Sequence, residues 1–286
     1  MKIFKPYFSY ILLMKKKDYI ILTLLLIIFT LLFKYNTLIK ESVIDSSNLW
    51  FYNIVTSLFP IYIITDLLIN YGIVNIFKNN NLFLSFISLI IGSPSNAKYI
   101  KEFYEDKLIS LEDANRLLLF SYSPSPLFII NISPNIKYAL YILLYIYFTN
   151  LILFLFTKKN TNINSSFTKV SFSKCVESSI NKSFKVLILI LGVIVIYNIL
   201  ITLLNNIFVN KLFFFKIILE LTNGLNITTK LGSNYLIYSI FISTFGGLSI
   251  HSQIKSILED SNISYYYFLK GRLISSIPLL FIIMFN

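Results

Sequence analysis

Cysteine and histidine are almost absent from this sequence. Its 286 residues include one cysteine, Cys175, and one histidine, His251. A single cysteine cannot form an intrachain disulfide, and the paired cysteine or histidine ligands that structural zinc and haem attachment require are missing. The sequence therefore predicts no metal site and no cofactor.

Motifs for catalysis are also missing. No arrangement of serine, histidine and aspartate with supporting motifs is visible, and no glycine-rich loop that would hold a phosphate. Only 13 residues are acidic. The acids between Glu102 and Asp113 alternate with lysine and arginine, as on a solvated helix face with pairs three or four residues apart. We therefore expect no enzymatic activity.

Basic residues outnumber the acidic ones, which gives a net charge of +12. The lysines gather at residues 1–17, where five precede the first apolar run, and at 157–185, where six accompany one acid, Glu177. Lysine clusters beside apolar spans usually mark cytoplasmic loops. We expect both clusters to be cytoplasmic, and we expect no nucleic-acid partner.

Long apolar runs dominate the remainder of the chain. It is 56% hydrophobic and 13% charged, and its mean hydropathy is +0.73. The uncharged run over 138–157 is long enough to cross a hydrocarbon core of about 30 Å. The composition predicts an all-α, polytopic helical membrane protein.

The apolar runs and polar gaps give a first map of the chain. The run that ends at Lys34 has no small-residue cleavage site, so it favours a retained signal anchor. We expect residues 36–49 to form a polar loop and 171–184 to form an interfacial helix. Spans are predicted over 19–35, 50–76, 138–156, 186–206, 212–231 and from Tyr265 to the C-terminus.

Two short apolar segments end in polar breaks. Residues 82–97 are apolar for about ten residues and then reach Gly92–Asn96, and residues 235–253 break at Gly246–Gly247. Glycine and proline end helices, and serine and asparagine hydrogen-bond locally. Such segments are typical of re-entrant or discontinuous helices. Another break, Ser123–Pro126, interrupts the apolar residues 117–132.

Three patches recur in order about 154 residues apart, which predicts an internal repeat. Asp66 corresponds to Glu220, Gly92 falls near Gly247, and the pair at Glu105 recurs at Glu259. We therefore divide the chain into four parts: a basic arm with the first span (1–49), the first unit (50–156), a polar, lysine-rich linker (157–185) and the second unit (186–286).

Acids and breaks supply the candidate site. An acid within a span costs at least about 2.5–3.5 kcal/mol, so it usually faces a cavity. Asp66 and Glu220 are the predicted ion-coupling residues, although solvated acids at span ends remain the alternative. Broken helices at membrane depth generally line a cavity. The predicted substrate-binding residues are Ser93, Ser95, Asn96, Lys98, Ser123, Ser125, Ser249, His251 and Gln253.

Plainer interpretations of these residues stay open. The breaks can be capped bends buried in protein, and Ser123 and Ser125 can cap a kinked helix. A lone histidine such as His251 is more often a hydrogen-bonded packing residue.

The residues around both breaks resemble a known family. IIGSPSNAK with LISLEDANRLLLFSYSPSPLFI resembles the first half of the YlbJ-type sporulation integral membrane proteins, and TFGGLSIHSQIKSIL with ISYYYFLKGRL resembles the second. The resemblance covers roughly residues 50–286. It implies the nucleoside-recognition "gate" superfamily, which is similar in architecture to concentrative nucleoside carriers. The stretch SPSNA departs from the more glycine-rich sequence expected there.

The resemblance also implies a function. It points to a spore-forming bacterium and to a carrier that moves a small polar or anionic solute, implied to be dipicolinate, across a forespore membrane. A nucleoside-type carrier and a non-transporting scaffold of the sporulation programme are the alternatives. The expected partners are the solute and the lipid bilayer, and the oligomeric state is left open between a monomer and a homo-oligomer.

Overall fold

The computed structural model describes residues 16–77, 79–157, 171–208 and 213–285, and within these ranges the chain is helical with no strand. The all-α prediction is therefore confirmed for the described chain. In order, the elements are α2 (Lys16–Lys34), α3 (Asn36–Leu49), η1 (Trp50–Val55), α4 (Thr56–Asn70), η2 (Ile73–Ile76), α5 (Asn80–Ile91), α6 (Ser95–Glu105), α7 (Leu111–Phe120), α8 (Pro126–Ile132), α9 (Ile136–Leu155), α10 (Phe172–Phe208), α11 (Phe213–Leu219), α12 (Leu221–Thr228), η3 (Gly232–Asn234), α13 (Tyr235–Phe245), α14 (Gly247–Leu258) and α15 (Tyr265–Phe285).

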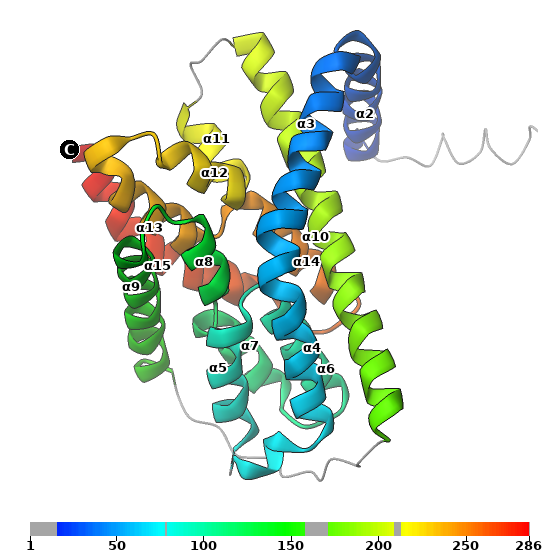
Figure 1. The fold of residues 1–286 in the computed structure, drawn as a ribbon, viewed down its shortest axis with the longest axis vertical. Helices are drawn as coiled ribbons and strands as arrows, with labels where there is room; N and C mark the ends of the chain where they lie inside the picture. The colour runs from blue at the N-terminus through cyan, green and yellow to red at the C-terminus, as the bar shows by residue number, and fades with distance from the viewer. Residues whose placement is uncertain (1–15, 78, 158–170, 209–212, 286) are drawn as a thin grey trace, which may run out of the picture.

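Two long helices lie side by side along the molecule. The elements α3, η1 and α4 form one continuous helix of 35 residues, and α10 has 37 residues and packs along it (Figure 1). Between this pair and α9 lie the shorter helices, several of which end well inside the molecule. The polar breaks are thereby placed in the interior.

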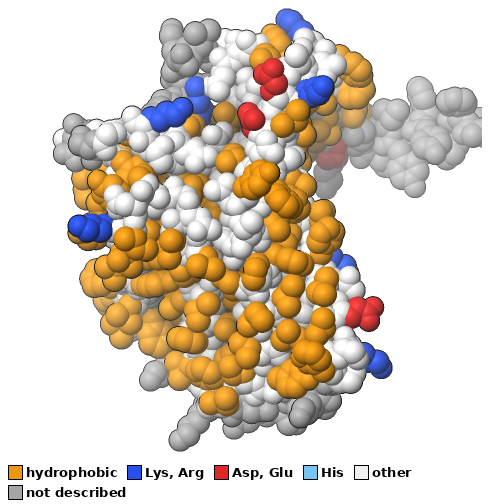
Figure 2. All heavy atoms as spheres, in the orientation of Figure 1, with side chains coloured by type: hydrophobic (Ala, Val, Ile, Leu, Met, Phe, Trp, Pro, Cys, Tyr) orange, Lys and Arg blue, Asp and Glu red, His pale blue; other side chains and the backbone are white. Residues whose placement is uncertain are grey.

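Four helices in the described part of the chain are long and apolar enough to cross a membrane. They are Asn36–Asn70, Ile136–Leu155, Phe172–Ile207 and Tyr265–Phe285, and only 33–39% of the apolar window of each is buried inside the protein. The larger part of each window is therefore partly or fully exposed at the surface of the protein. Figure 2 shows hydrophobic side chains covering the middle and lower part of one face, with charged groups near the top and at both side edges. This surface is consistent with a membrane protein.

Two predictions about polar segments are wrong. Residues 36–49 are the helix α3 and not a loop, because the segment has no glycine or proline and its polar groups are satisfied locally. The hydroxyls of Ser46 and Ser47 donate to carbonyls four residues back. Residues 171–184 are not a separate interfacial helix, since they are the first turns of α10.

The first predicted span, 19–35, coincides with α2. However, α2 is not among the four helices that meet the length and composition of a span, because it carries charged residues at both ends. It lies beside the top of α3, apart from the main body (Figure 1). Residues 1–15 of the basic arm, and 158–170 of the linker, lie outside the described residues.

The prediction of a continuous span over 212–231 is also wrong. The chain there forms two short helices, α11 and α12, which separate at Glu220. Glu220 has an extended backbone, with φ −137° and ψ 127°, and its carboxylate accepts hydrogen bonds from the first turn of α12. Such a side chain ends one helix and starts the next. The matching Asp66 remains inside the continuous α4.

The helices of the interior are interrupted at four places, three of which contain glycine or proline. The first break (Gly92–Pro94) separates α5 from α6, and the second break (Gly246) separates α13 from α14. The third break (Ser121–Ser125) separates α7 from α8, and the fourth break is Glu220. Gly92 and Gly246 have φ of 80° and 94°, a region that L side chains rarely adopt.

Candidate functional site

The first and third breaks are in direct contact. The backbone N–H of Ser93 donates to the Ser123 carbonyl at 2.7 Å. A Cβ at Gly92 would lie 2.3 Å from the Ser125 nitrogen, so only glycine lets the two backbones approach this closely. Residues far apart in sequence are thus joined at one point in the interior.

Asn96 strengthens this junction. The Ser93 hydroxyl donates to Asn96 Oδ1 at 2.7 Å, and Asn96 Nδ2 donates to the Ser121 carbonyl at 3.0 Å. Asn96 is 1% exposed. Its amide therefore links the two breaks.

The second and fourth breaks complete the cluster. The Tyr122 hydroxyl, from the third break, donates to the Ser243 carbonyl at 2.9 Å, and a Cβ at Gly246 would lie 2.7 Å from the same hydroxyl oxygen. A Cβ at Gly247 would lie 3.0 Å from the Leu221 nitrogen, beside Glu220. The four breaks are therefore linked by a series of contacts, from the first to the third, from the third to the second and from the second to the fourth.

A small central cavity lies against these breaks. Its volume is about 30 Å³, which is room for about one water molecule. The lining residues are Ile54, Leu58, Ser93, Pro94, Pro124, Ser125, Phe128, Ile190, Ile194, Glu220, Leu221, Thr222, Ile250 and Gln253. The walls come from η1, α4, α8, α10, α12 and α14, and the polar groups come from the first, third and fourth breaks and from α12 and α14. No lysine or arginine is among the described residues that line the cavity.

Two lining groups are free to bind a guest molecule. The Ser125 hydroxyl and Gln253 Oε1 are buried and have no hydrogen-bond partner among the described residues. Leaving a buried polar atom unpaired costs about 1–3 kcal/mol. A polar guest that paired with these atoms would recover part of that cost.

Glu220 is the charged residue of the cavity. It is 1% exposed, and its two oxygens accept from the backbone N–H groups of Thr222 at 3.0 Å and Asn223 at 2.7 Å. Ser249, in the first turn of α14, lies beside the carboxylate. The N–H groups and the positive end of α12 favour the carboxylate, whereas burial favours the protonated acid.

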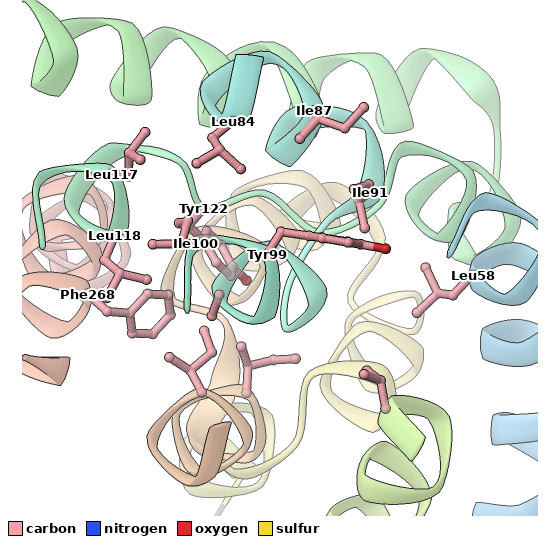
Figure 3. Close-up of a cluster of buried hydrophobic side chains, with 14 of the residues drawn as sticks. Leu58, Leu84, Ile87, Ile91, Tyr99, Ile100, Leu117, Leu118, Tyr122 and Phe268 are labelled. Carbon is pink, nitrogen blue, oxygen red and sulfur yellow. The ribbon is translucent and has the colours of Figure 1, made fainter. Parts of the chain in front are cut away.

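Asp66 lies in a different setting. One carboxylate oxygen accepts from the Tyr99 hydroxyl, and the other has no partner among the described residues. Figure 3 shows the Tyr99 hydroxyl pointing from α6 toward α4. Asp66 does not line the central cavity. The two predicted coupling acids thus match in sequence but not in surroundings.

Lys98 and His251 are also engaged elsewhere. The Lys98 ammonium lies 3.9 Å from Glu102 and 5.1 Å from the centre of the Tyr99 ring. His251 Nδ1 is 2.6 Å from the Tyr265 hydroxyl, and its Nε2 is 3.0 Å from the Phe245 carbonyl. Both ring nitrogens of His251 therefore already have partners within the protein.

All of the predicted site residues can be divided by whether they line the central cavity. Ser93, Ser125, Gln253 and Glu220 line the cavity. Ser95, Asn96, Lys98, Ser123, Ser249 and His251 lie in or close to the breaks without lining the cavity, and Asp66 lies within the continuous α4. The Ser123 hydroxyl, for example, donates to the Pro124 carbonyl at 2.8 Å.

Arg272 is the main residue that the sequence analysis missed. It is 0% exposed, and its guanidinium donates to the Thr244 and Leu119 carbonyls and to Asn150 Oδ1 at 3.2–3.4 Å. It also lies 4.3 Å from the Tyr122 ring centre. The two carbonyls belong to the last turns of α13 and α7, where a cation is favourable. The sequence did offer a signal for this residue: Arg272 is a charged residue at the eighth position of the final helix, where a charge inside a span usually has a partner or a function.

Comparison with known proteins gives no assignment. No family model matches the chain, and neither a curated protein nor a solved structure matches it. The relationship to the YlbJ-type proteins stays a prediction from the two motif pairs.

Proposed function

We propose that this chain is an integral membrane carrier that moves a small polar solute through the region where its four breaks meet. The observation that carries the proposal is the convergence of these breaks on a buried cavity that contains Glu220. Interrupted helices around a midplane cavity are a common way for carriers to bind solutes. A buried acid without a role would only cost stability.

We further propose that the carrier consists of two related units, residues 50–156 and 186–286. The order α5, break, α6, α7 recurs as α13, break, α14, α15. Three further pairs keep the spacing that relates Asp66 to Glu220: Ser110 with Ser264, Lys101 with Lys255, and Pro124 with Pro278. These agreements support a duplication.

The breaks of the two units differ in place. The first unit is broken between α7 and α8, where the second continues as α15, and the second is broken at Glu220, where the first continues as α4. α5 and α13 have 12 and 11 residues, so neither alone spans a hydrocarbon core of about 30 Å. We interpret both as re-entrant or discontinuous segments.

The cavity is too small for an organic solute, because ligand pockets usually measure about 300–1,000 Å³. Solute entry therefore requires the breaks to separate, and the structure corresponds to a closed form of the proposed carrier. In this scheme Glu220 is the proton-coupling residue, since protonation would weaken its bonds to Thr222 and Asn223 in the cavity wall. Asp66 is a second candidate that would act through Tyr99.

Dipicolinate is the first solute to test, because the family resemblance implies it and a role in sporulation. A nucleoside-type solute is the alternative cargo within the carrier class. A non-transporting scaffold has no use for a buried acid facing a cavity, so Glu220 argues against that alternative. Spores lacking this protein are expected to contain little dipicolinate, and normal content would reject this cargo.

The proposal is tested by uptake into proteoliposomes. Wild-type protein should take up a labelled small polar solute faster than empty vesicles, and Glu220→Gln should abolish the uptake while leaving folding intact. Glu259→Gln is the matched control, because Glu259 is an exposed acid near the end of α14. Uptake by Glu220→Gln at the wild-type rate would contradict the coupling role.

A further inference from the structure

A second, larger pocket lies between α3, η1, α10 and α12. Its volume is about 440 Å³, within the usual range of small-molecule pockets. The pocket is lined by Ser42, Asp45, Asn48, Leu49, Tyr52, Asn53, Asn198, Thr202 and Asn223. We call it the polar pocket, because most of these side chains carry an amide, a hydroxyl or a carboxylate.

Amide groups in the polar pocket are held in place by one another. Asn223 Nδ2 donates to Asn198 Oδ1 at 3.3 Å, and Asn198 Nδ2 donates to the Ser46 hydroxyl at 2.9 Å. Asn198 is 6% exposed, so its orientation is fixed inside the protein. Asn48 and Asn53 add two more amides from the opposite wall. Amides present both donors and acceptors, which suits a solute with hydrogen-bonding groups.

The charge of the polar pocket has one sign. Asp45 on α3 is exposed, and no lysine or arginine is among the described residues that line the pocket. A negative solute would approach this carboxylate without a compensating cation. Glu220, which lines the neighbouring central cavity, is a second acid close to the polar pocket. The lining chemistry thus opposes a dianion and favours a solute that donates hydrogen bonds.

The polar pocket and the central cavity are separated by a single layer of residues. The Asn223 side chain lines the polar pocket, while its backbone N–H donates to Glu220, which lines the cavity. Asn53 and Ile54 are adjacent in η1; Asn53 lines the polar pocket, and Ile54 lines the central cavity. η1 is a π-helix, and such turns occur frequently at functional sites. A solute in the polar pocket would therefore sit directly next to the closed cavity.

We infer that the polar pocket is the entry site of the proposed carrier and that it takes a small hydrogen-bonding solute without negative charge. This inference rests on the proposed carrier function, and it departs from the dianionic cargo that the family resemblance implies. The residues that select the solute are Asp45, Asn198 and Asn223.

A pair of probes with one shape and different charge tests the inference. Pyridine-2,6-dicarboxylate, which is dipicolinate, is a dianion, whereas pyridine-2,6-dicarboxamide is neutral and donates four N–H groups. Binding of both to the purified full-length protein is measured by calorimetry, and uptake of both is measured in proteoliposomes. The dicarboxamide should bind at least about fivefold more tightly, as expected from one unscreened carboxylate contact at about 4 Å in water.

Charge reversal locates the binding. Asp45→Lys should reduce or invert the preference for the dicarboxamide. Glu41→Lys is the matched control, because Glu41 is an exposed acid one turn earlier on α3 and does not line the pocket. It produces the same change in net charge and should leave the preference close to that of the wild type. Asn198→Ala should weaken binding of the dicarboxamide.

Each other outcome overturns the inference. Tighter binding of dipicolinate than of the dicarboxamide by the wild-type protein would reject the proposed solute class. The carrier proposal would still hold in that case if the wild-type protein took up dipicolinate and Glu220→Gln abolished that uptake. Equal shifts in Asp45→Lys and Glu41→Lys would show that the polar pocket is not the site. Binding of neither probe also rejects the inference. The carrier proposal fails separately, if a wider solute panel shows no uptake above empty vesicles.

Discussion

Gly92→Ala is the most direct test of the contact between the first and third breaks. Gly92 has φ 80° and ψ 172°, a conformation that is essentially restricted to glycine and costs other residues about 1–3 kcal/mol. The added Cβ would also lie 2.3 Å from the Ser125 nitrogen and 2.7 Å from the Ser125 Cα. These are backbone atoms, so no flexible side chain can move aside.

Overpacking of a tightly packed site costs a further about 1–3 kcal/mol. The expected loss for Gly92→Ala is therefore about 2–6 kcal/mol in the free energy of unfolding, or at least about 4 °C in melting temperature. Separation of the breaks would also lengthen the hydrogen bond from Ser93 to Ser123. Solute binding should weaken together with stability.

Thermal unfolding in detergent, followed by size-exclusion chromatography, measures the effect. Gly192→Ala is the matched control, since Gly192 lies in α10 with no atom within 4 Å of the added Cβ. Alanine is the better helix former, so this control should be neutral or slightly stabilising. A Gly92→Ala protein that melts within about 1 °C of the wild type would refute the close contact of the two breaks.

Two further predictions concern the packing around α15. Gly271→Ala should cost about 1–3 kcal/mol, because its Cβ would lie 2.0 Å from the Leu119 carbonyl oxygen of α7; a melting temperature equal to that of Gly192→Ala would contradict this crossing. Arg272→Lys should lower stability by about 2 kcal/mol, since one ammonium cannot replace the planar fork that reaches Thr244, Leu119 and Asn150. In a double-mutant cycle, Asn150→Ala should cost less in the Arg272→Lys background than in the wild type, and additive losses would show that the two side chains are not coupled.

The helix breaks could be predicted from sequence because their causes are local. Gly92, Pro94 and Gly246 interrupt a helix through their own backbone conformation, which does not depend on the residues that pack around them. The long uncharged runs likewise predicted apolar helices over 138–156 and 186–206; the first matches α9 to within two residues at each end, and the second lies within α10. Local chemistry and run length were sufficient for these elements.

Residue roles depended on tertiary partners, which the sequence does not show. Glu220 was predicted to lie within a span, but its carboxylate accepts from the N–H groups of Thr222 and Asn223, two and three residues ahead, and divides the helix. Asn96 could equally bind a solute or a neighbouring loop, and it is the Ser121 carbonyl, 25 residues away, that occupies its amide. Arg272 was missed although it lies inside the predicted final span, because the sequence does not show the Thr244 and Leu119 carbonyls that it reaches.

The different surroundings of the two acids have a consequence for coupling. Glu220 bonds to backbone N–H groups at the start of α12 and faces the cavity, so its protonation would change the cavity wall and the helix end together. Asp66 bonds to a side-chain hydroxyl and faces α6, so its protonation would change only the packing of α4 against α6. If the chain is a duplicated carrier, one acid can therefore take the coupling role while its counterpart becomes structural. Glu220→Gln should then abolish uptake, whereas Asp66→Asn should reduce stability and leave part of the uptake.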